Sequence, residues 1–141
     1  MTDTDRDTMI AVALAHAAAE AAMDIEATMA TLDENPTYEL QPIGIVLRGR
    51  DVARQYYEHF FANCYPRIAG YALRSEWVAD EGVLQEYSLH IDNADGTNSR
   101  HDIIGILTFG VAGKLSGERI YASDELIKFM FGPVIDQGVR V

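Results

Sequence analysis

The sequence has one cysteine among 141 residues, half as many basic as acidic side chains, and no long hydrophobic run. Cys64 cannot form a disulfide within the chain, which fits either a reducing compartment or a protein indifferent to redox conditions. The net charge of −11 argues against nucleic acid and anionic lipid surfaces as partners. No apolar run approaches the roughly 20 residues of a membrane span. The first residues, MTDTDRDT, are acidic where a secretory leader is basic, so we expect a cytoplasmic protein.

Motifs for bound metals and phosphates are also missing. The four histidines, at 16, 59, 90 and 101, do not have the spacing of metal ligands. No glycine-rich phosphate loop precedes a helix, and no Ser/His/Asp arrangement is readable along the chain. The sequence thus predicts neither a metal nor a cofactor.

The composition is that of an ordinary globular protein, with 48% hydrophobic and 23% charged residues, and we expect one domain over residues 1–141. Alanine-rich residues 8–22 predict a first helix. A second helix is expected to begin at the N-cap Asp24 and to stop at Asn35-Pro36, and a third follows Gly49. Short strands are expected between the last two helices, at TYEL and IGIVL.

After Pro66 the hydrophobic period changes to two residues, which is typical of strands. Four long strands are predicted, in YALRSEWVA, VLQEYSLHID, HDIIGILTF and KLSGERIYAS. Helices followed by a meander of strands predict an α+β fold. We expect three N-terminal helices to close one side of a strongly curved, mainly antiparallel sheet and to leave a cavity between them.

Three segments resemble a known family: MDIEATMATLDENPTYEL, LRGRDVARQYYEHF and LTFGVAGKLSGERIYASDEL. The last contains a hairpin in which Phe109, Gly113-Lys114-Leu115 and Tyr121 match the family pattern. The chain resembles the nuclear transport factor 2-like, or SnoaL-like, superfamily, and is most similar to ketosteroid isomerase-like and limonene-epoxide-hydrolase-like proteins. The resemblance implies a conical α+β barrel, a scaffold that hosts isomerases, dehydratases, epoxide hydrolases, cyclases and non-enzymatic binders.

The catalytic residues of ketosteroid isomerases are not matched. That family has an acidic tyrosine on the first helix, a general-base aspartate and a protonated aspartate on the sheet. The resemblance places His16, Leu40 and Gly105 at these positions. We therefore do not expect ketosteroid isomerisation by the known route.

The catalytic residues of limonene-epoxide hydrolases are matched only in part. Tyr38 matches their water-positioning tyrosine, but Leu40 replaces their asparagine. Their Asp-Arg-Asp triad is replaced by Leu89, Tyr87 and Ile120. Epoxide hydrolysis through that triad is not expected either.

The stretch VALAHAAAEAAM, residues 12–23, has two polar side chains, His16 and Glu20, on one face of the predicted helix. The resemblance points the His16 position into the cavity. A neighbouring carboxylate favours the charged imidazole and raises its pKa toward neutrality, where acid–base exchange is efficient. We hypothesise that His16 is the general acid/base and that Glu20 orients it; the alternative is a structural hydrogen bond. The resemblance places Tyr57 where it would support His16 from the third helix.

Strand parity adds two further candidates. If Gly105 faces inward, so does His101, which would then lie near the open end of the cavity; a solvated position at the rim is the alternative. The resemblance turns the face of Glu118 inward as well. A second carboxyl in the cavity would need a partner or a raised pKa.

The rest of the predicted lining is apolar or aromatic, and Gly105 and Ala122 leave it wide. It comprises Met23, Tyr38, Leu40, Tyr56, Phe60, Trp77, Tyr87, Leu89, Ile91, Ile103, Leu107, Ile120 and Ala122. Such a lining indicates a bulky apolar ligand, aromatic or polycyclic, that is held by burial with few polar anchors.

The opposite face of the sheet is predicted to be partly apolar. Ile104 and Ile106 face outward by the same parity, and Leu84 and Tyr121 join them. Relatives commonly dimerise through this surface, so the resemblance implies a homodimer with twofold symmetry.

Together these features predict a cofactor-independent acid/base enzyme of isomerase, dehydratase, cyclase or lyase type that acts on an apolar small molecule. Its catalytic candidates are His16, Glu20, Tyr57, Glu118 and His101. Two alternatives stay open: a non-catalytic binding module for a hydrophobic small molecule, and a subunit that serves association alone.

Overall fold

The structure, a computed structural model, describes residues 3–110 and 113–141. Its helices are α1 (Asp3–Ala21), α2 (Ile25–Ala30), α3 (Arg50–His59) and α4 (Asp124–Phe131). Its strands are β1 (Leu32–Gln41), β2 (Ile45–Arg48), β3 (Ile68–Ala79), β4 (Gly82–Asp92), β5 (Asn98–Phe109), β6 (Leu115–Tyr121) and β7 (Val139–Arg140). A π-helical turn and a 3₁₀ turn extend α3 through residues 60–67, and a 3₁₀ turn extends α4 through residues 132–137.

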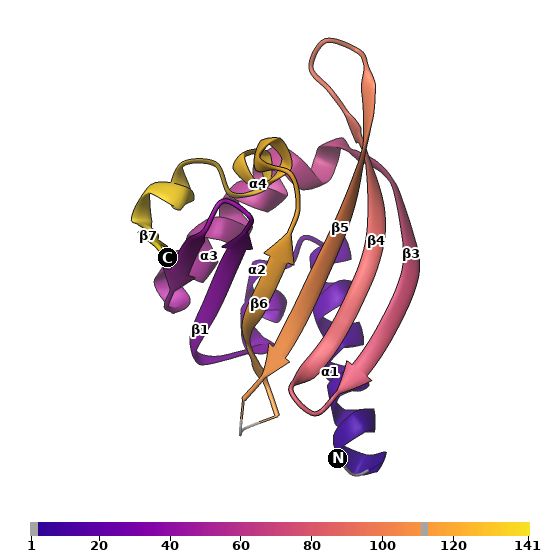
Figure 1. The fold of residues 1–141 in the computed structure, drawn as a ribbon, viewed down its shortest axis with the longest axis vertical. Helices are drawn as coiled ribbons and strands as arrows, with labels where there is room; N and C mark the ends of the chain where they lie inside the picture. The colour runs from indigo at the N-terminus through magenta and orange to yellow at the C-terminus, as the bar shows by residue number, and fades with distance from the viewer. Residues whose placement is uncertain (1–2, 111–112) are drawn as a thin grey trace.

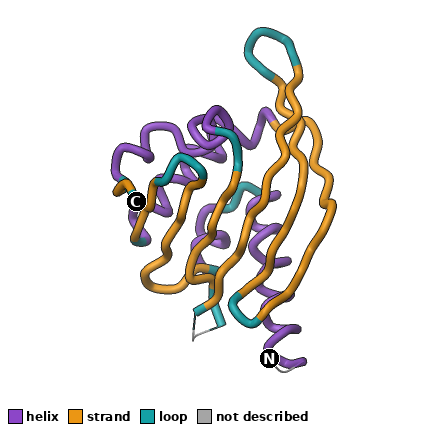
Figure 2. Tube along the Cα trace, in the orientation of Figure 1, coloured by secondary structure: helices purple, strands orange, loops and turns teal. Residues whose placement is uncertain are grey.

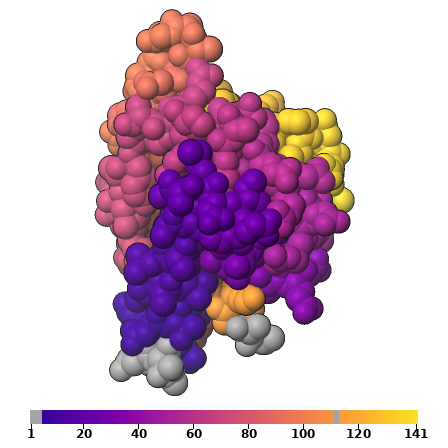
Figure 3. Space-filling view, turned by 180° about the vertical axis from the view of Figure 1, so that it is seen from behind, coloured from indigo at the N-terminus to yellow at the C-terminus, as the bar shows by residue number. Residues whose placement is uncertain are grey.

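The described strands form one curved sheet in the order β3-β4-β5-β6-β1-β2-β7. Neighbouring strands are antiparallel except β1 and β6, which run parallel. The sheet bends around the helices without closing on itself (Figure 1, Figure 2). Seen from behind, the part of the chain that contains α1, α2 and α3, coloured indigo to magenta, lies in front of the long strands (Figure 3). The predicted α+β class and curved, mainly antiparallel sheet are confirmed.

Helix α1 lies on the sheet through small side chains. Ala13, His16 and Ala19 are its buried residues, and their spacing of three places them on one face. Alanine methyl groups fill little of the space between a helix and a sheet. The alanine-rich sequence of α1 therefore leaves room for a cavity above the strands.

Helix α2 is shorter than predicted. Asp24 caps it as expected, because its side chain accepts a backbone N–H bond at 3.0 Å. The helix nevertheless ends at Ala30, and β1 runs through Asn35-Pro36. The prediction that this dipeptide ends the helix is therefore wrong. The register of β1 against β6 shifts between Leu32 and Thr37, so proline, which has no N–H, lies in an irregular stretch of the strand.

The core between α3, α4 and β1 consists largely of aromatic rings. Tyr56 stacks on Phe131 with 3.9 Å between ring centroids, and Tyr38 packs edge-on against Tyr57. These four buried residues come from α3, α4 and β1, so they join both helices to the sheet. In the part of the chain that the structure describes, no helix has the length and apolarity needed to cross a membrane.

Candidate active site

A cavity of about 320 Å³ lies between α1, α3 and the concave face of the sheet. Four of its lining side chains end in an imidazole, carboxyl or amide group: His16, Glu20, Gln85 and Glu118. The remaining lining is aromatic or aliphatic, and consists of Ala13, Ala17, Ala21, Tyr56, Phe60, Tyr65, Ile68, Tyr71, Tyr87, Leu89, Leu107 and Met130. Ionisable groups therefore face a mostly apolar space.

Several predicted lining residues lie deeper than the cavity. Leu40, Ile103, Ile120 and Ala122 are buried and face inward, but they belong to the core cluster that includes Phe131. Side chains closer to α1 form the cavity wall in their place. These four residues support the wall and do not contact the cavity.

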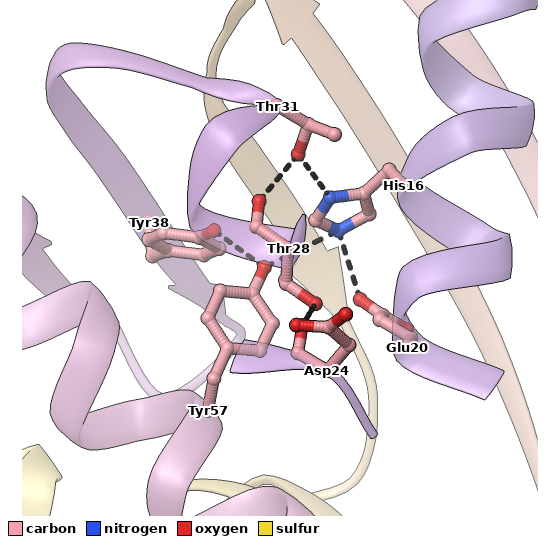
Figure 4. A network of polar contacts seen from close by, with 7 residues as sticks. All are labelled: His16, Glu20, Asp24, Thr28, Thr31, Tyr38 and Tyr57. Carbon is pink, nitrogen blue, oxygen red and sulfur yellow. Dashed lines mark hydrogen bonds and ion pairs between the residues drawn. The ribbon is translucent and has the colours of Figure 1, made fainter. Parts of the chain in front are cut away.

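His16 is 4% exposed and has partners on both ring nitrogens (Figure 4). Its Nδ1 lies 2.7 Å from Oγ1 of Thr31, and its Nε2 lies 2.8 Å from Oε1 of Glu20. Burial lowers the pKa of His16, but the charge and hydrogen bond of Glu20, together with the charge of Glu118, outweigh it. The pKa of His16 is therefore raised above its ordinary value.

Tyr57 and Tyr38 extend this network away from α1. The hydroxyl of Tyr57 lies 3.3 Å from Nε2 of His16 and 2.6 Å from the hydroxyl of Tyr38, and both tyrosines are buried. Burial raises the pKa of both hydroxyls well above the ordinary value. They therefore stay protonated at neutral pH and serve as hydrogen-bond partners. Tyr38, predicted as a lining residue, lies behind Tyr57.

Glu118 faces the cavity from β6. Burial and the charge of Glu20 raise its pKa to about 8, although His16 opposes the shift. Within the described residues its carboxyl has no hydrogen-bond or ion-pair partner. A Cβ atom at Gly105 on β5 would lie 2.9 Å from Oε1 of Glu118. Because Gly105 has no side chain, there is room for the carboxyl of Glu118 beside it.

The prediction that Trp77 lines the cavity is wrong. Trp77 is 63% exposed and pairs with Leu84 on the outer face of the sheet. The register between β3 and β4 shifts between Leu73 and Ser75, and such a bulge reverses the alternation of side chains. Tyr71, before the bulge, lines the cavity, whereas Trp77, after it, faces away.

The prediction that His101 belongs to this cavity is also wrong. His101 lines a separate hollow of about 260 Å³ together with Arg67, Ile91, Asn93, Glu125, Leu126 and Phe129. Its Nε2 lies 2.9 Å from Oγ of Ser99. Four residues along a strand cover about 13 Å, which separates His101 from Gly105. Met23, another expected lining residue, is exposed just after α1.

Sequence reasoning misses several residues of the site. Tyr65, Ile68, Tyr71, Gln85 and Met130 line the cavity without having been predicted to do so. Gln85 could have been found, because it lies two residues before Tyr87 along β4 and therefore shares its face. Thr31 has no such signal, since it follows α2 and is 15 residues from His16 in sequence.

Other parts of the molecule are weaker candidates for a functional site. A larger hollow, of about 590 Å³, includes Arg50, but this guanidinium already donates to the backbone carbonyls of Met29, Leu32 and Asp33. Burial raises the pKa of Cys64 to about 12, so its thiol is a poor nucleophile. Among the residues described, no group of three His, Cys, Asp or Glu side chains could hold a metal ion.

Comparisons with known proteins bear on the fold. No protein-family model and no curated protein sequence matches the chain. Among solved structures, an NTF-2 like protein of unknown function from Burkholderia xenovorans LB400 is 23% identical, with a TM-score of 0.64. That match covers 84% of this chain and 85% of the other.

Two further similar structures have a described activity or ligand. SalBIII, an epoxide hydrolase/cyclase-like enzyme with a role in pyran ring formation in salinomycin, is 16% identical with a TM-score of 0.70, over 86% of this chain and 95% of its own. RV0760c from Mycobacterium tuberculosis, in complex with estradiol-17beta-hemisuccinate, is 14% identical with a TM-score of 0.67, over 84% of this chain and 95% of its own. The chain therefore has the nuclear transport factor 2-like fold, as its motifs predicted.

Proposed function

We propose that this protein is a cofactor-independent acid/base enzyme that moves a proton on a bulky apolar small molecule. One observation carries the proposal: His16, Glu20 and Glu118 face a single cavity whose other walls are mostly apolar. Ionisable groups with shifted pKa values in an apolar cleft are typical of catalytic sites. Solved structures similar to this chain include an enzyme with a role in pyran ring formation and a protein in complex with estradiol-17beta-hemisuccinate, which supports a guest of this kind.

The two walls of the cavity would have complementary roles. With its pKa raised to about 8, Glu118 is mostly a neutral carboxylic acid at pH 7 and can donate to an oxygen of the substrate. On α1, Glu20 and His16 would take a proton from carbon or oxygen on the other side of the guest. In an isomerisation, Glu20 would return that proton to another atom of the guest and Glu118 would regain its own. In a dehydration or lyase cleavage, the proton of Glu118 would leave with the departing group, so Glu20 would release its proton to solvent and Glu118 would be reprotonated from solvent.

Glu118 would also take the place of the sheet carboxyl that ketosteroid isomerases have and this chain lacks at the matching position. The resemblance to ketosteroid isomerases places their sheet aspartate at Gly105, where this chain has no side chain. Oε1 of Glu118 reaches to within 2.9 Å of the point that a Cβ there would occupy. The neighbouring strand would thus supply a carboxyl to almost the same part of the cavity.

The experiment that tests this function is proton exchange in D₂O. The purified protein is incubated with a panel of polycyclic and aromatic ketones, and NMR follows the loss of C–H signals beside the carbonyl. We expect saturable exchange that falls by about a hundredfold or more in Glu20→Gln and in Glu118→Gln. Asp102→Asn, on the outer face, is the matched control. Compounds that bind without any exchange above buffer would contradict the enzyme and leave the binding module.

The outer face supports the expected homodimer. Ile104 and Tyr121 are exposed there, and Trp77 adds to the apolar surface. An exposed apolar patch on a sheet face is a common site of self-association. We propose that two copies of the chain meet through this face.

A further inference from the structure

The polar network around His16 begins on α2 (Figure 4). Thr31 is the C-cap residue of that helix, and its Oγ1 lies 2.6 Å from the carbonyl oxygen of Thr28 and 2.7 Å from Nδ1 of His16. The hydroxyl of Thr28 donates in turn to the carbonyl of Asp24 at 2.7 Å. The hydroxyls of Thr28 and Thr31 thus each donate to a backbone carbonyl.

These contacts decide where the hydrogen of His16 lies. A threonine hydroxyl has a single proton, and a carbonyl oxygen can only accept. The proton of Thr31 therefore points to Thr28, and Oγ1 of Thr31 accepts a bond from His16. It follows that Nδ1 of His16 is protonated, in the neutral ring as well as in the charged one.

A second proton must lie on the other side of the ring. If Nε2 and Glu20 were both unprotonated, two acceptors would face each other at 2.8 Å, which is repulsive. One proton therefore lies between Nε2 and Oε1, on the ring or on the carboxyl. The hydroxyl of Tyr57, at 3.3 Å, is the more distant partner of Nε2.

We propose that Thr31 is a positioning residue that holds His16 in its Nδ1-protonated form, so that the exchangeable proton of the site is shared by Nε2 and Glu20. Both ring nitrogens then have partners, whereas the Glu20 side chain is 27% exposed and lines the cavity. Glu20 is therefore the group that meets the ligand, and His16 acts through it. This last step rests on the proposed function; the protonation of His16 does not.

The protonation is tested without a substrate, by long-range ¹H–¹⁵N spectra of the histidine rings across pH. His16 is assigned by the signals that disappear in His16→Gln. We expect Nδ1 to keep the shift of a protonated nitrogen throughout, while Nε2 titrates. Glu20 on α1, Glu118 on β6 and Tyr57 on α3 face the ring, so the titration is repeated in Glu118→Gln. A neutral ring with its hydrogen on Nε2 in the unaltered protein would overturn the proposal.

The role of Thr31 is tested with two variants. Thr31→Val keeps the shape of the side chain but removes the acceptor, and we expect the neutral ring to shift its hydrogen to Nε2 and to titrate at lower pH. Thr31→Ser keeps the hydroxyl and should restore the original spectrum. An unchanged spectrum in Thr31→Val would contradict the assignment. If that variant does not fold, the spectrum of the unaltered protein still decides whether Nδ1 of His16 is protonated.

Turnover separates this inference from the proposed function. With a compound found in the exchange screen, Thr31→Val should lower kcat about tenfold or more and leave KM nearly unchanged, whereas Thr31→Ser should recover kcat. An unaltered kcat in Thr31→Val would overturn the positioning role. If no compound exchanges with any form of the protein but Nδ1 is protonated as expected, the proposed function fails and the assignment of the proton stands.

Discussion

At the scale of single residues, Glu118 should dominate the pH dependence of stability. Its pKa is raised from 4.5 to about 8 by folding, so its contribution is fully present below pH 4.5 and is lost as pH rises toward 8. The raised pKa of His16 acts in the same direction above pH 6.5. We expect the unfolding free energy to fall with pH over this range, by on the order of 4 kcal/mol from Glu118.

Glu118→Gln isolates this effect, because glutamine does not ionise. Urea unfolding at several pH values should show that the variant loses less stability than the unaltered protein between pH 5 and pH 8. Asp102→Asn, which changes an exposed carboxyl, serves as the control. Parallel curves for Glu118→Gln and the unaltered protein would contradict the buried position of the carboxyl.

Gly105 should be sensitive to the smallest added side chain. In Gly105→Ala the new methyl group would lie 2.9 Å from Oε1 of Glu118, so the carboxyl must move. We expect its titration midpoint, followed by carboxyl ¹³C NMR, to shift from about 8, and turnover in the exchange assay to fall. Gly70→Ala is a matched control, since a methyl group there meets His90 at an ordinary 3.5 Å. Equal spectra for both variants would argue against a steric role for Gly105.

The predictability of the site differs from residue to residue. His16 and Glu20 could be paired from sequence because helical spacing alone brings side chains four residues apart together. Thr31 could not, because its contact with His16 depends on how α2 folds back against α1. The position of Glu118 followed from the resemblance and from strand parity, but its space beside Gly105 is visible only when β5 and β6 are paired.

At the scale of elements, the cap of α2 affects more than its own six residues. Asp24 accepts the N–H of Ala27 at 3.0 Å, and the C-cap residue of the same helix is Thr31, which contacts His16. We expect Asp24→Ala to lower the unfolding free energy by about 1 kcal/mol, measured by urea unfolding. Asp24→Asn keeps the cap and should cost much less. A similar loss in both variants would indicate that the cap is not the cause.

The strands show what a periodic pattern can and cannot predict. The alternation along β4 and β5 is long and uninterrupted, so it gave the inward and outward faces correctly, including Ile104. The bulge in β3 cannot be read from the alternation, because it depends on the register against β4. The alternation therefore predicts the wrong face for Trp77. Pro36 predicts a helix end for a similar reason, since the irregular register of β1 is also a property of the paired sheet.

At the scale of the whole molecule, the outer face of the sheet predicts the oligomeric state. We expect sedimentation at micromolar concentration to give the mass of a dimer. Ile104→Asp should shift it toward the monomer, because a charge would then be buried at the contact. Leu14→Asp on α1, where the side chain is 66% exposed, is the control. A monomer for the unaltered protein would exclude this interface.

The parallel pairing of β1 with β6 has a consequence for biosynthesis. On a ribosome, β1 emerges long before its partner, since Leu32 and Leu115 are neighbours in the sheet but lie far apart along the chain. Until then one edge of β1 has open backbone groups, and such edges are prone to aggregate in nascent chains. Because β6 also brings Glu118, its docking would both cover this edge and complete the acidic wall of the cavity.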